Sequence, residues 1–183
     1  LVRSGVGQVT LIDMDDVCIT NTNRQLPALV DTVGQTKVSV LAERMNRINP
    51  ECRVHPITEF LTAATVERHL AGPFHYVIDA VDRASTKALI ISRCLALQLP
   101  VLTVGGAGGR RDATAVRCGD LARTGGDDLL RGVRRRLRRE YAMEIVEGVT
   151  LGVSAVYSAE PQVYPGADGT CRTAAEAGGS LKM

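Results

Sequence analysis

The sequence predicts an α/β protein built on a doubly wound, mainly parallel sheet. Short apolar runs alternate with amphipathic helical segments, which is the pattern of a parallel sheet covered on both faces. Two of these runs end in carboxylates, Asp13 and Asp79. A carboxylate that follows a buried parallel strand lies at the carboxyl edge of the sheet, where nucleotides bind in such folds.

The bulk composition fits one globular domain with a real core. The chain has 183 residues, of which 45% are hydrophobic and 23% charged, and its net charge is +2. An aromatic content of 3% argues against a base-stacking surface. With no membrane-length apolar run and no visible signal peptide, we expect a cytoplasmic protein and leave peripheral membrane association open. The five cysteines form no C-x-x-C pair, so we expect buried free thiols.

The first residues read as the end of a helix, because Gly5 follows a short helical turn. Gly5-Val6-Gly7 does not qualify as a phosphate-binding fingerprint, since it precedes a strand instead of following one. That strand is predicted at 8–13, and a polar loop at 14–27 follows it. We therefore expect a strand and a glycine-rich turn upstream of residue 1, so that this sequence lacks the middle strand of its sheet.

Apolar spacing and breaker residues predict the remaining elements. Val38, Leu41, Met45 and Ile48 recur at helical intervals, and Asn49-Pro50 ends that helix. Thr62 is expected to cap the next helix. The predicted elements after the first loop are a helix at 36–48, a strand at 53–57, a helix at 63–71, a strand at 76–79, a helix at 83–97, a strand at 100–104, a possible edge strand at 114–118, a helix at 127–142 and a strand at 149–157.

Three charged residues of the stretch 8–37 suit a nucleoside triphosphate. Asp13 can accept ribose hydroxyls, while Arg24 and Lys37 can bind phosphate oxygens. Lys37 lies in a first helical turn, where the helix dipole disfavours a cation, and this favours a functional explanation. Structural alternatives stay open: Asp13 can cap its loop, and Arg24 can pair with Asp79 or Asp82.

Two features of the later sequence allow more than one interpretation. The glycine loop 105–109 either lets the backbone approach a ligand or turns a tight corner. The helix at 127–142 has an apolar stripe and six arginines between 131 and 139. These arginines form either a solvated face or a contact with an RNA backbone. The candidate RNA contacts are Arg131, Arg134, Arg135 and Arg138.

Four motifs together resemble the ThiF/MoeB/HesA superfamily of ubiquitin-activating-like adenylating enzymes, whose Rossmann-like fold agrees with the predicted sheet. Residues 13–25 resemble its D-x-D-x-V-x-x-S-N-x-x-R-Q signature. The other matches are Gly34-Gln35-Thr36-Lys37 to G-x-x-K, Arg47-Ile48-Asn49-Pro50 to R-I-N-P, and Asp79-Ala80-Val81-Asp82 to D-x-x-D. Within the superfamily, the chain is most similar to the bacterial branch that dehydrates threonylcarbamoyladenosine in tRNA.

The resemblance implies ATP and Mg²⁺ as cofactors and adenylation of a carboxylate as the reaction. Asp13 would bind the ribose, and Arg24, Lys37 and Asp82 would be the catalytic residues. Asp82 would hold Mg²⁺ through ATP, whereas Asp79 is a structural acid at a strand end. The implied nucleotide-binding residues are Asp13, Thr20, Asn21, Asn23, Arg24, Lys37 and Asp82. The implied partners are tRNA, a second copy of the chain and a sulfur-transfer protein of the SufE-like (CsdE) type, with no DNA.

The same resemblance implies one adenylating domain over 1–183, truncated at both ends. Residues 1–104 would form its nucleotide-binding core and 105–183 a substrate-side extension. Two other functions remain open: adenylation of the C-terminus of a ubiquitin-like sulfur carrier, and a non-catalytic interaction module in which the absent phosphate loop prevents ATP binding. A nicotinamide dehydrogenase is disfavoured, because hydride transfer does not require Arg24 and Lys37.

Overall fold

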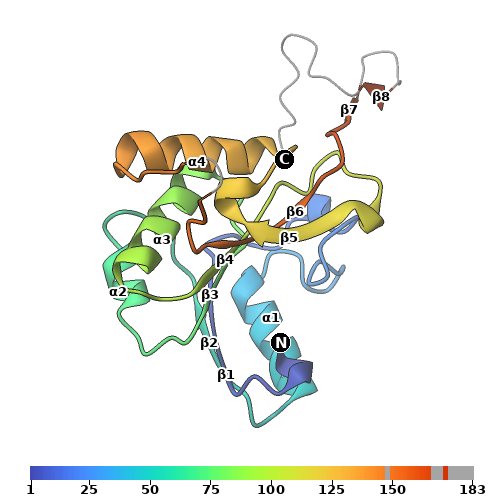
Figure 1. Cartoon of the computed structure of the whole chain (residues 1–183). Helices are drawn as coiled ribbons and strands as arrows, with labels where there is room; N and C mark the ends of the chain where they lie inside the picture. The colour runs from blue at the N-terminus through green and yellow to red at the C-terminus, as the bar shows by residue number, and fades with distance from the viewer. Residues whose placement is uncertain (147–148, 166–170, 173–183) are drawn as a thin grey trace. The chain divides into compact units, whose positions relative to one another are not determined.

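The structure is a computed structural model that describes residues 1–146, 149–165 and 171–172. Figure 1 shows the course of the chain, which forms two compact units, Leu1–Thr65 (unit 1) and Val66–Met183 (unit 2). This division does not test the prediction of one adenylating domain with a core and an extension that meet at residue 104, which remains a prediction.

Unit 1 is a strand–helix–strand motif with a two-stranded parallel sheet. β1 (Gln8–Ile12) pairs with β2 (Arg53–Ile57) in a register that sets Gln8 opposite Arg53 and Ile12 opposite Ile57. The helix α1 (Lys37–Ile48) connects the two strands and packs against both. The 3-10 turn η1 (Val2–Ser4) precedes β1, and Gly5 closes it with a φ of 84°. All four elements confirm the sequence-based predictions, because strong local signals bound each of them.

Unit 2 contains a four-stranded mixed sheet. Its strands are β3 (Val77–Asp79), β4 (Val101–Val104), β5 (Val116–Asp120) and β6 (Ser154–Ser158), in the order β3-β4-β6-β5. The first three strands in this order are parallel, and β5 is an antiparallel edge strand. The short strands β7 (Tyr164–Pro165) and β8 (Cys171–Arg172) pair separately. The mainly parallel sheet with a mixed extension is therefore as predicted.

Among its described residues, unit 2 has three α-helices: α2 (Val66–Leu70), α3 (Ala84–Ala96) and α4 (Asp128–Glu140). α3 and α4 lie side by side (Figure 1), and Gly132 allows the close approach, since a Cβ there would stand 3.4 Å from the Cβ of Ala84. The predicted apolar stripe of α4 is confirmed by the complete burial of Leu130, Val133 and Leu137. No helix in the described part of the chain is long and apolar enough to span a membrane.

The parallel strands form two sheets, one in each unit, instead of one continuous sheet. Among the described residues, β1 has only β2 as a partner and β3 has only β4. The predicted alternation of strands and helices is confirmed within each unit. The further strand expected upstream of residue 1 lies outside this sequence and is not tested.

Two predicted elements begin well after their expected first residues. The helix predicted at 63–71 is confined to α2, and Thr62 does not cap it. Instead, the Thr65 hydroxyl accepts the Thr62 N–H at 2.9 Å and donates to the Phe60 carbonyl at 2.8 Å, so a side chain competes with the first helical turn. The strand predicted at 149–157 begins only at Ser154, because Gly152 adopts a φ of 77° and the Asp120 carboxylate binds the Leu151 and Gly152 amides.

Candidate functional site

The end of β1 brings three of the charged residues of unit 1 together. The half-buried Asp13 follows β1 directly, and its Oδ1 accepts the N–H of Asp15 at 2.9 Å. The Lys37 Nζ contacts Asp15 Oδ2 at 2.9 Å, and the Lys37 N–H donates to the Asp15 carbonyl. A tight turn therefore places an acid and a lysine at the carboxyl end of β1, where a nucleotide site was predicted.

The start of α1 fixes the position of Lys37. Thr36 is the N-cap, and its Oγ1 accepts the N–H of Ser39 at 3.3 Å. The Lys37 side chain is 15% exposed and that of Asp15 is 61% exposed, so solvent reaches the acid more than the lysine. Asp15 orders this loop, because it binds both the side chain and the backbone N–H of Lys37.

Four of the predicted nucleotide-binding residues lie in and just after the 3-10 turn η2 (Ile19–Asn21): Thr20, Asn21, Asn23 and Arg24. Asn21 is buried, and its Oδ1 accepts the Cys18 N–H at 3.0 Å, so this amide shapes the loop. Arg24 is exposed, and its Nη1 donates to the Thr20 carbonyl at 2.8 Å and to Asn23 Oδ1 at 3.0 Å. These local contacts gather Thr20, Asn23 and Arg24 on one exposed loop.

The cysteines correct one expectation. All four described cysteines are free, but only Cys52 and Cys94 are buried, whereas Cys18 and Cys118 are exposed. Cys118 is exposed because β5 is an edge strand, and Cys18 because it begins the turn η2. The Thr20 hydroxyl donates to Cys18 Sγ at 3.2 Å and lowers the pKa of that thiol, while burial raises the pKa of Cys94 to about 11. Cys171 lies where side chains are not described.

Asp82 lies in the exposed turn between β3 and α3 of unit 2. Among the described residues, no group of three or more His, Cys, Asp or Glu side chains could hold a metal ion by itself. A single exposed carboxylate fits Mg²⁺ only where phosphate oxygens and water supply the other ligands, which is how Mg²⁺ binds beside ATP. The residues present therefore fit a metal that arrives with the nucleotide.

Three buried side chains, Asp79, Lys87 and Thr103, form a cluster next to this turn, which we call the buried triad. The Lys87 Nζ donates to Asp79 Oδ2 at 3.1 Å, to the Asp79 carbonyl at 3.2 Å and to Thr103 Oγ1 at 3.2 Å. The Thr103 hydroxyl donates to Asp79 Oδ2 at 2.7 Å. Burial lowers the pKa of Lys87, and the neighbouring Asp79 carboxylate acts in the opposite direction.

Sequence reasoning identified Asp79 as structural but missed Lys87 and Thr103. A signal for both was present. Lys87 shares the helical face of Ile90, Ile91 and Cys94, so a lysine stands at a core position of α3. The β3–β4 register sets Thr103, one residue before the end of β4, directly opposite Asp79, the last residue of β3. A lysine on an apolar stripe that follows a strand-ending acid indicates a buried ion pair.

The glycine loop after β4 turns a tightly packed corner. A Cβ at Gly105 would collide with the Asp127 carboxylate, and one at Gly109, where φ is 70°, would collide with the Val163 carbonyl. Asp127 Oδ2 accepts the Gly106 N–H at 2.9 Å and contacts Arg110 Nη2 at 3.4 Å. Asp127 Oδ1 also caps α4 through the Leu130 N–H. Packing therefore explains the glycines at 105 and 109 without a ligand.

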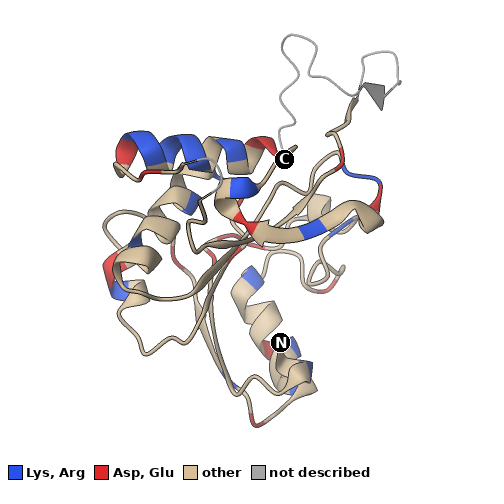
Figure 2. Ribbon diagram, viewed as in Figure 1, with Lys and Arg blue, Asp and Glu red and all other residues tan. Residues whose placement is uncertain are grey.

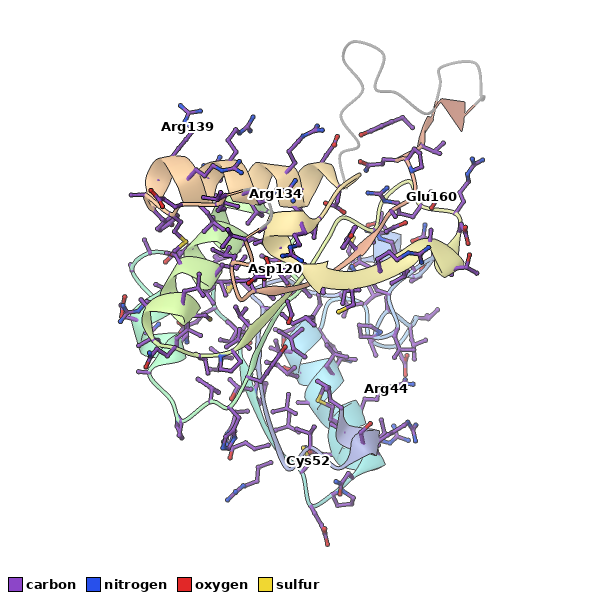
Figure 3. The ribbon with its side chains drawn as sticks, in the orientation of Figure 1. Arg44, Cys52, Asp120, Arg134, Arg139 and Glu160 are labelled. Atoms are coloured by element: carbon purple, nitrogen blue, oxygen red, sulfur yellow. The ribbon has the colours of Figure 1, made fainter. Side chains whose placement is uncertain are left out.

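The arginines of α4 concentrate positive charge on unit 2 (Figure 2). A hollow of about 510 Å³ runs beside α4 and includes all four predicted tRNA contacts. Its lining residues are Asp128, Arg131, Gly132, Arg134, Arg135 and Arg138. The predicted set therefore lies around one surface depression, while Arg139 projects away from α4 (Figure 3).

The four arginines that line the hollow differ in their contacts. Arg134 donates to the Leu121 carbonyl at 3.3 Å and to the Thr124 hydroxyl, and Arg138 donates to the Ile145 carbonyl at 3.1 Å. Burial, followed by the charge of Arg138, lowers the pKa of Arg134. Arg131 pairs with Asp128 at 2.8 Å on an exposed surface, and Arg135 is exposed. Arg131 and Arg135 are thus the more available cations.

Comparisons with known proteins agree on one family. The model of the ThiF family matches residues 1–160. The chain is 46% identical to the tRNA threonylcarbamoyladenosine dehydratase of Escherichia coli, over 100% of this chain and 69% of that protein. It is 43% identical to the dehydratase of Haemophilus influenzae, over 96% of this chain and 67% of that protein. The chain thus spans about two thirds of the length of these relatives.

A solved structure and a more distant relative sharpen the comparison. The E. coli dehydratase TcdA in complex with ATP superposes with a TM-score of 0.87 and 46% identity, over 90% of this chain and 68% of that chain. The molybdopterin-synthase adenylyltransferase of E. coli is 32% identical, but over only 56% of this chain. The likeness to the E. coli dehydratase therefore extends over the whole chain, whereas the likeness to the adenylyltransferase covers little more than half of it.

Proposed function

Because this chain belongs to the ThiF family, we propose that the protein containing it uses ATP to dehydrate threonylcarbamoyladenosine in tRNA. The observation that carries the proposal is the 46% identity to a tRNA threonylcarbamoyladenosine dehydratase along the whole chain. The turn that joins Asp13, Asp15 and Lys37 at the end of β1 supports the nucleotide part of this function.

The reaction follows from the need to convert a carboxylate oxygen into a leaving group. A carboxylate oxygen of the threonyl moiety attacks the α-phosphorus of ATP, and the bond to the bridging oxygen breaks as pyrophosphate leaves. An internal nucleophile of the modified nucleoside then attacks the activated carbonyl carbon, and AMP leaves with the former carboxylate oxygen. AMP is a far better leaving group than hydroxide. The elements of water therefore leave the nucleoside as the oxygen on AMP and the proton that the internal nucleophile releases, while ATP is cleaved to AMP and pyrophosphate.

The residues of unit 1 suit the charge that develops in the first step. Negative charge grows on the α-phosphate and on the departing pyrophosphate, so fixed cations there stabilise the transition state more than the ground state. We assign the ribose to Asp13, the phosphates to Thr20, Asn23 and Arg24, and the β/γ-phosphates to Lys37. Asn21 serves this group indirectly, because its buried amide holds the loop that carries Arg24.

Lys37 needs no large rearrangement to reach a phosphate. Its present partner, the 61% exposed carboxylate of Asp15, is an anion close to solvent. A phosphate oxygen can replace this carboxylate oxygen at similar distance, because exposed ion pairs contribute little free energy. In unit 2, Asp82 would complete the ligand sphere of Mg²⁺ bound to ATP, and the metal would neutralise charge on the phosphates.

The hollow beside α4 suits the backbone of tRNA. Arg131 and Arg135 can each neutralise a phosphate, and release of the displaced counterions would make RNA binding depend on salt. The double variant Arg131→Ala/Arg135→Ala is expected to weaken tRNA binding and to reduce the slope of log Kd against log salt by about 2, at roughly 1 per phosphate contact. Arg44→Ala, at an exposed position of α1, is the control. An unchanged slope in the double variant would remove α4 from the RNA site.

Further properties implied by the family are proposals of the same kind. A homodimer is supported by exposed apolar side chains before α1, among them Leu26 at 64%, Leu29 at 53% and Val30 at 88%. Sedimentation of the full-length protein, compared with its Val30→Asp variant, tests this assignment. A sulfur-transfer partner and a cytoplasmic location are proposed from the family and from the tRNA substrate alone.

The deciding experiment is mass spectrometry of tRNA nucleosides after incubation with the full-length protein and Mg-ATP. We expect threonylcarbamoyladenosine to lose one water, and Asp13→Ala to abolish this change. Adenylation of a sulfur-carrier C-terminus without any change in tRNA would favour the second enzymatic function. An absence of heat on calorimetric titration with Mg-ATP would favour a non-catalytic module, and would overturn both enzymatic functions.

A further inference from the structure

The buried triad lies at the carboxyl edge of the β3–β4 pair and at the base of the turn that carries Asp82. Asp79 and Thr103 form the last residue pair between β3 and β4, and α3 begins at Ala84, two positions after Asp82. The side chains of Asp79 and Lys87 are 0% exposed. No ligand or substrate can therefore reach the lysine directly.

The two oxygens of Asp79 have separate partners. Oδ2 receives the Lys87 ammonium at 3.1 Å and the Thr103 hydroxyl at 2.7 Å. Oδ1 receives the Val81 N–H at 3.1 Å. Lys87 and Thr103 therefore fix the orientation of the carboxylate, and the carboxylate in turn fixes the backbone one residue before Asp82.

Stability alone gives little reason for this cluster. A buried ion pair can often be replaced by apolar side chains of similar volume with little or no loss of stability, because desolvation offsets the attraction between the charges. The apolar stripe of α3 would accommodate such a replacement, since Ala88, Ile91 and Cys94 are 0% exposed. A fully buried cluster of charges next to a predicted metal-binding turn instead indicates a functional role.

We infer that Asp79 is a positioning residue, which is oriented by Lys87 and Thr103 and acts through the Val81 N–H to hold Asp82 in place. This inference rests on the proposed function, in which Asp82 binds Mg²⁺ that is held by ATP. The geometry assigns no proton transfer and no direct ligand contact to Lys87. The hydrogen bond from the Val81 N–H to Asp79 restricts the turn, so that the Asp82 carboxylate is already oriented for Mg²⁺ when ATP binds.

Two double variants test the inference, and neither carries a charge at position 79 or 87. Lys87→Met/Asp79→Asn removes both charges but keeps a side-chain oxygen that can accept the Val81 N–H. Lys87→Met/Asp79→Val removes both charges and the acceptor. Both variants avoid the unpaired buried carboxylate that Lys87→Met alone would leave, and both are compared at a temperature where melting curves show complete folding.

The readouts separate positioning from stability. We expect hydrogen exchange of the Val81 amide to stay slow in the wild type and the Asn double variant, and to become fast in the Val double variant. We expect kcat for ATP–pyrophosphate exchange to fall by about 10²-fold in the Val variant relative to the Asn variant, with a smaller change in the KM for ATP. A 1 Å misplacement of catalytic groups has an effect of about this size.

The inference is wrong if the Val double variant protects the Val81 amide, or if its kcat matches that of the Asn double variant. A wild-type protein that catalyses no pyrophosphate exchange would overturn the proposed function instead. The exchange rate of the Val81 amide would still report whether the triad holds the turn, so the two failures are distinguishable.

Discussion

Two lysine–aspartate pairs of nearly equal length occupy opposite environments in this protein. Lys37 and Asp15 in unit 1 are 2.9 Å apart, with side chains 15% and 61% exposed. Lys87 and Asp79 in unit 2 are 3.1 Å apart, and both side chains are 0% exposed. Because the distances agree and the burial does not, burial decides what each lysine can do.

The exposed pair can exchange partners, whereas the buried pair cannot. Water and ions compete with Asp15 for the Lys37 ammonium, so a triphosphate can displace the carboxylate at little cost. Separating Lys87 from Asp79 would leave an uncompensated charge in the core. The first lysine is therefore suited to a ligand and the second to a scaffold, although sequence alone shows two similar residues near strand ends.

The largest expected effect concerns stability and separates the two pairs. Lys87→Met should lower the free energy of unfolding by about 3–5 kcal/mol, since it leaves the Asp79 carboxylate buried without its cation. Lys37→Met should lower it by no more than about 1 kcal/mol, because its pair is partly exposed. Urea unfolding of both variants measures the difference. Equal losses would contradict the contrast between an exchangeable and a fixed pair.

The next effect concerns catalysis, to which Lys37 is expected to contribute although it contributes little to stability. Lys37→Ala should reduce kcat for ATP–pyrophosphate exchange by about 10²–10³-fold, or about 2.7–4 kcal/mol of barrier, because it removes a cation from the charge that develops on pyrophosphate. The expected loss arises without a large change in stability.

Arg44→Ala provides the control for Lys37→Ala, since Arg44 is an exposed cation on the same helix. Figure 3 shows Arg44 on α1. This variant should exchange pyrophosphate at the wild-type rate. A Lys37→Ala variant that retained the wild-type rate would assign the Lys37–Asp15 pair to structure and would remove the functional half of the comparison.

Local signals made much of the fold predictable. The bounds of β2 were predicted to the residue, and those of α1 and α3 to within one residue, because apolar spacing and breakers such as Asn49-Pro50 act within a few residues. The prediction for β6 was wrong because a side chain from elsewhere competes with the backbone. Asp120 binds the amides of Leu151 and Gly152 from a distant part of the chain, and no local pattern predicts this delay of β6.

The candidate site was predictable in its residue types but not in its partners. The sequence indicated Asp13 and Lys37, yet their connection through Asp15 depends on a turn that only three-dimensional structure shows. Lys87 was missed because a lysine is expected on a solvated face. Thr103 was missed because its importance comes from the β3–β4 register, which joins residues 24 positions apart.

A third carboxylate, Glu160, extends the comparison to an acid without a lysine. Its carboxylate accepts the backbone N–H groups of Arg111, at 2.8 Å, and Asp112, at 3.1 Å, and these two bonds lower its pKa from the ordinary value of 4.5. Its contribution to stability is therefore complete above about pH 5 and is lost as the pH falls through the lowered folded-state pKa. Figure 3 labels this residue.

Glu160→Gln should consequently flatten the fall of unfolding free energy below pH 5, with the smallest effect of the three changes, because solvent competes for these hydrogen bonds. Urea unfolding between pH 3 and pH 7 measures the profile. Glu51→Gln, which removes an exposed carboxylate of unit 1, should keep the wild-type profile. If Glu160→Gln also kept the wild-type profile, backbone amides would not hold this acid, and only the two lysine pairs would remain as evidence that surroundings set the role of a carboxylate.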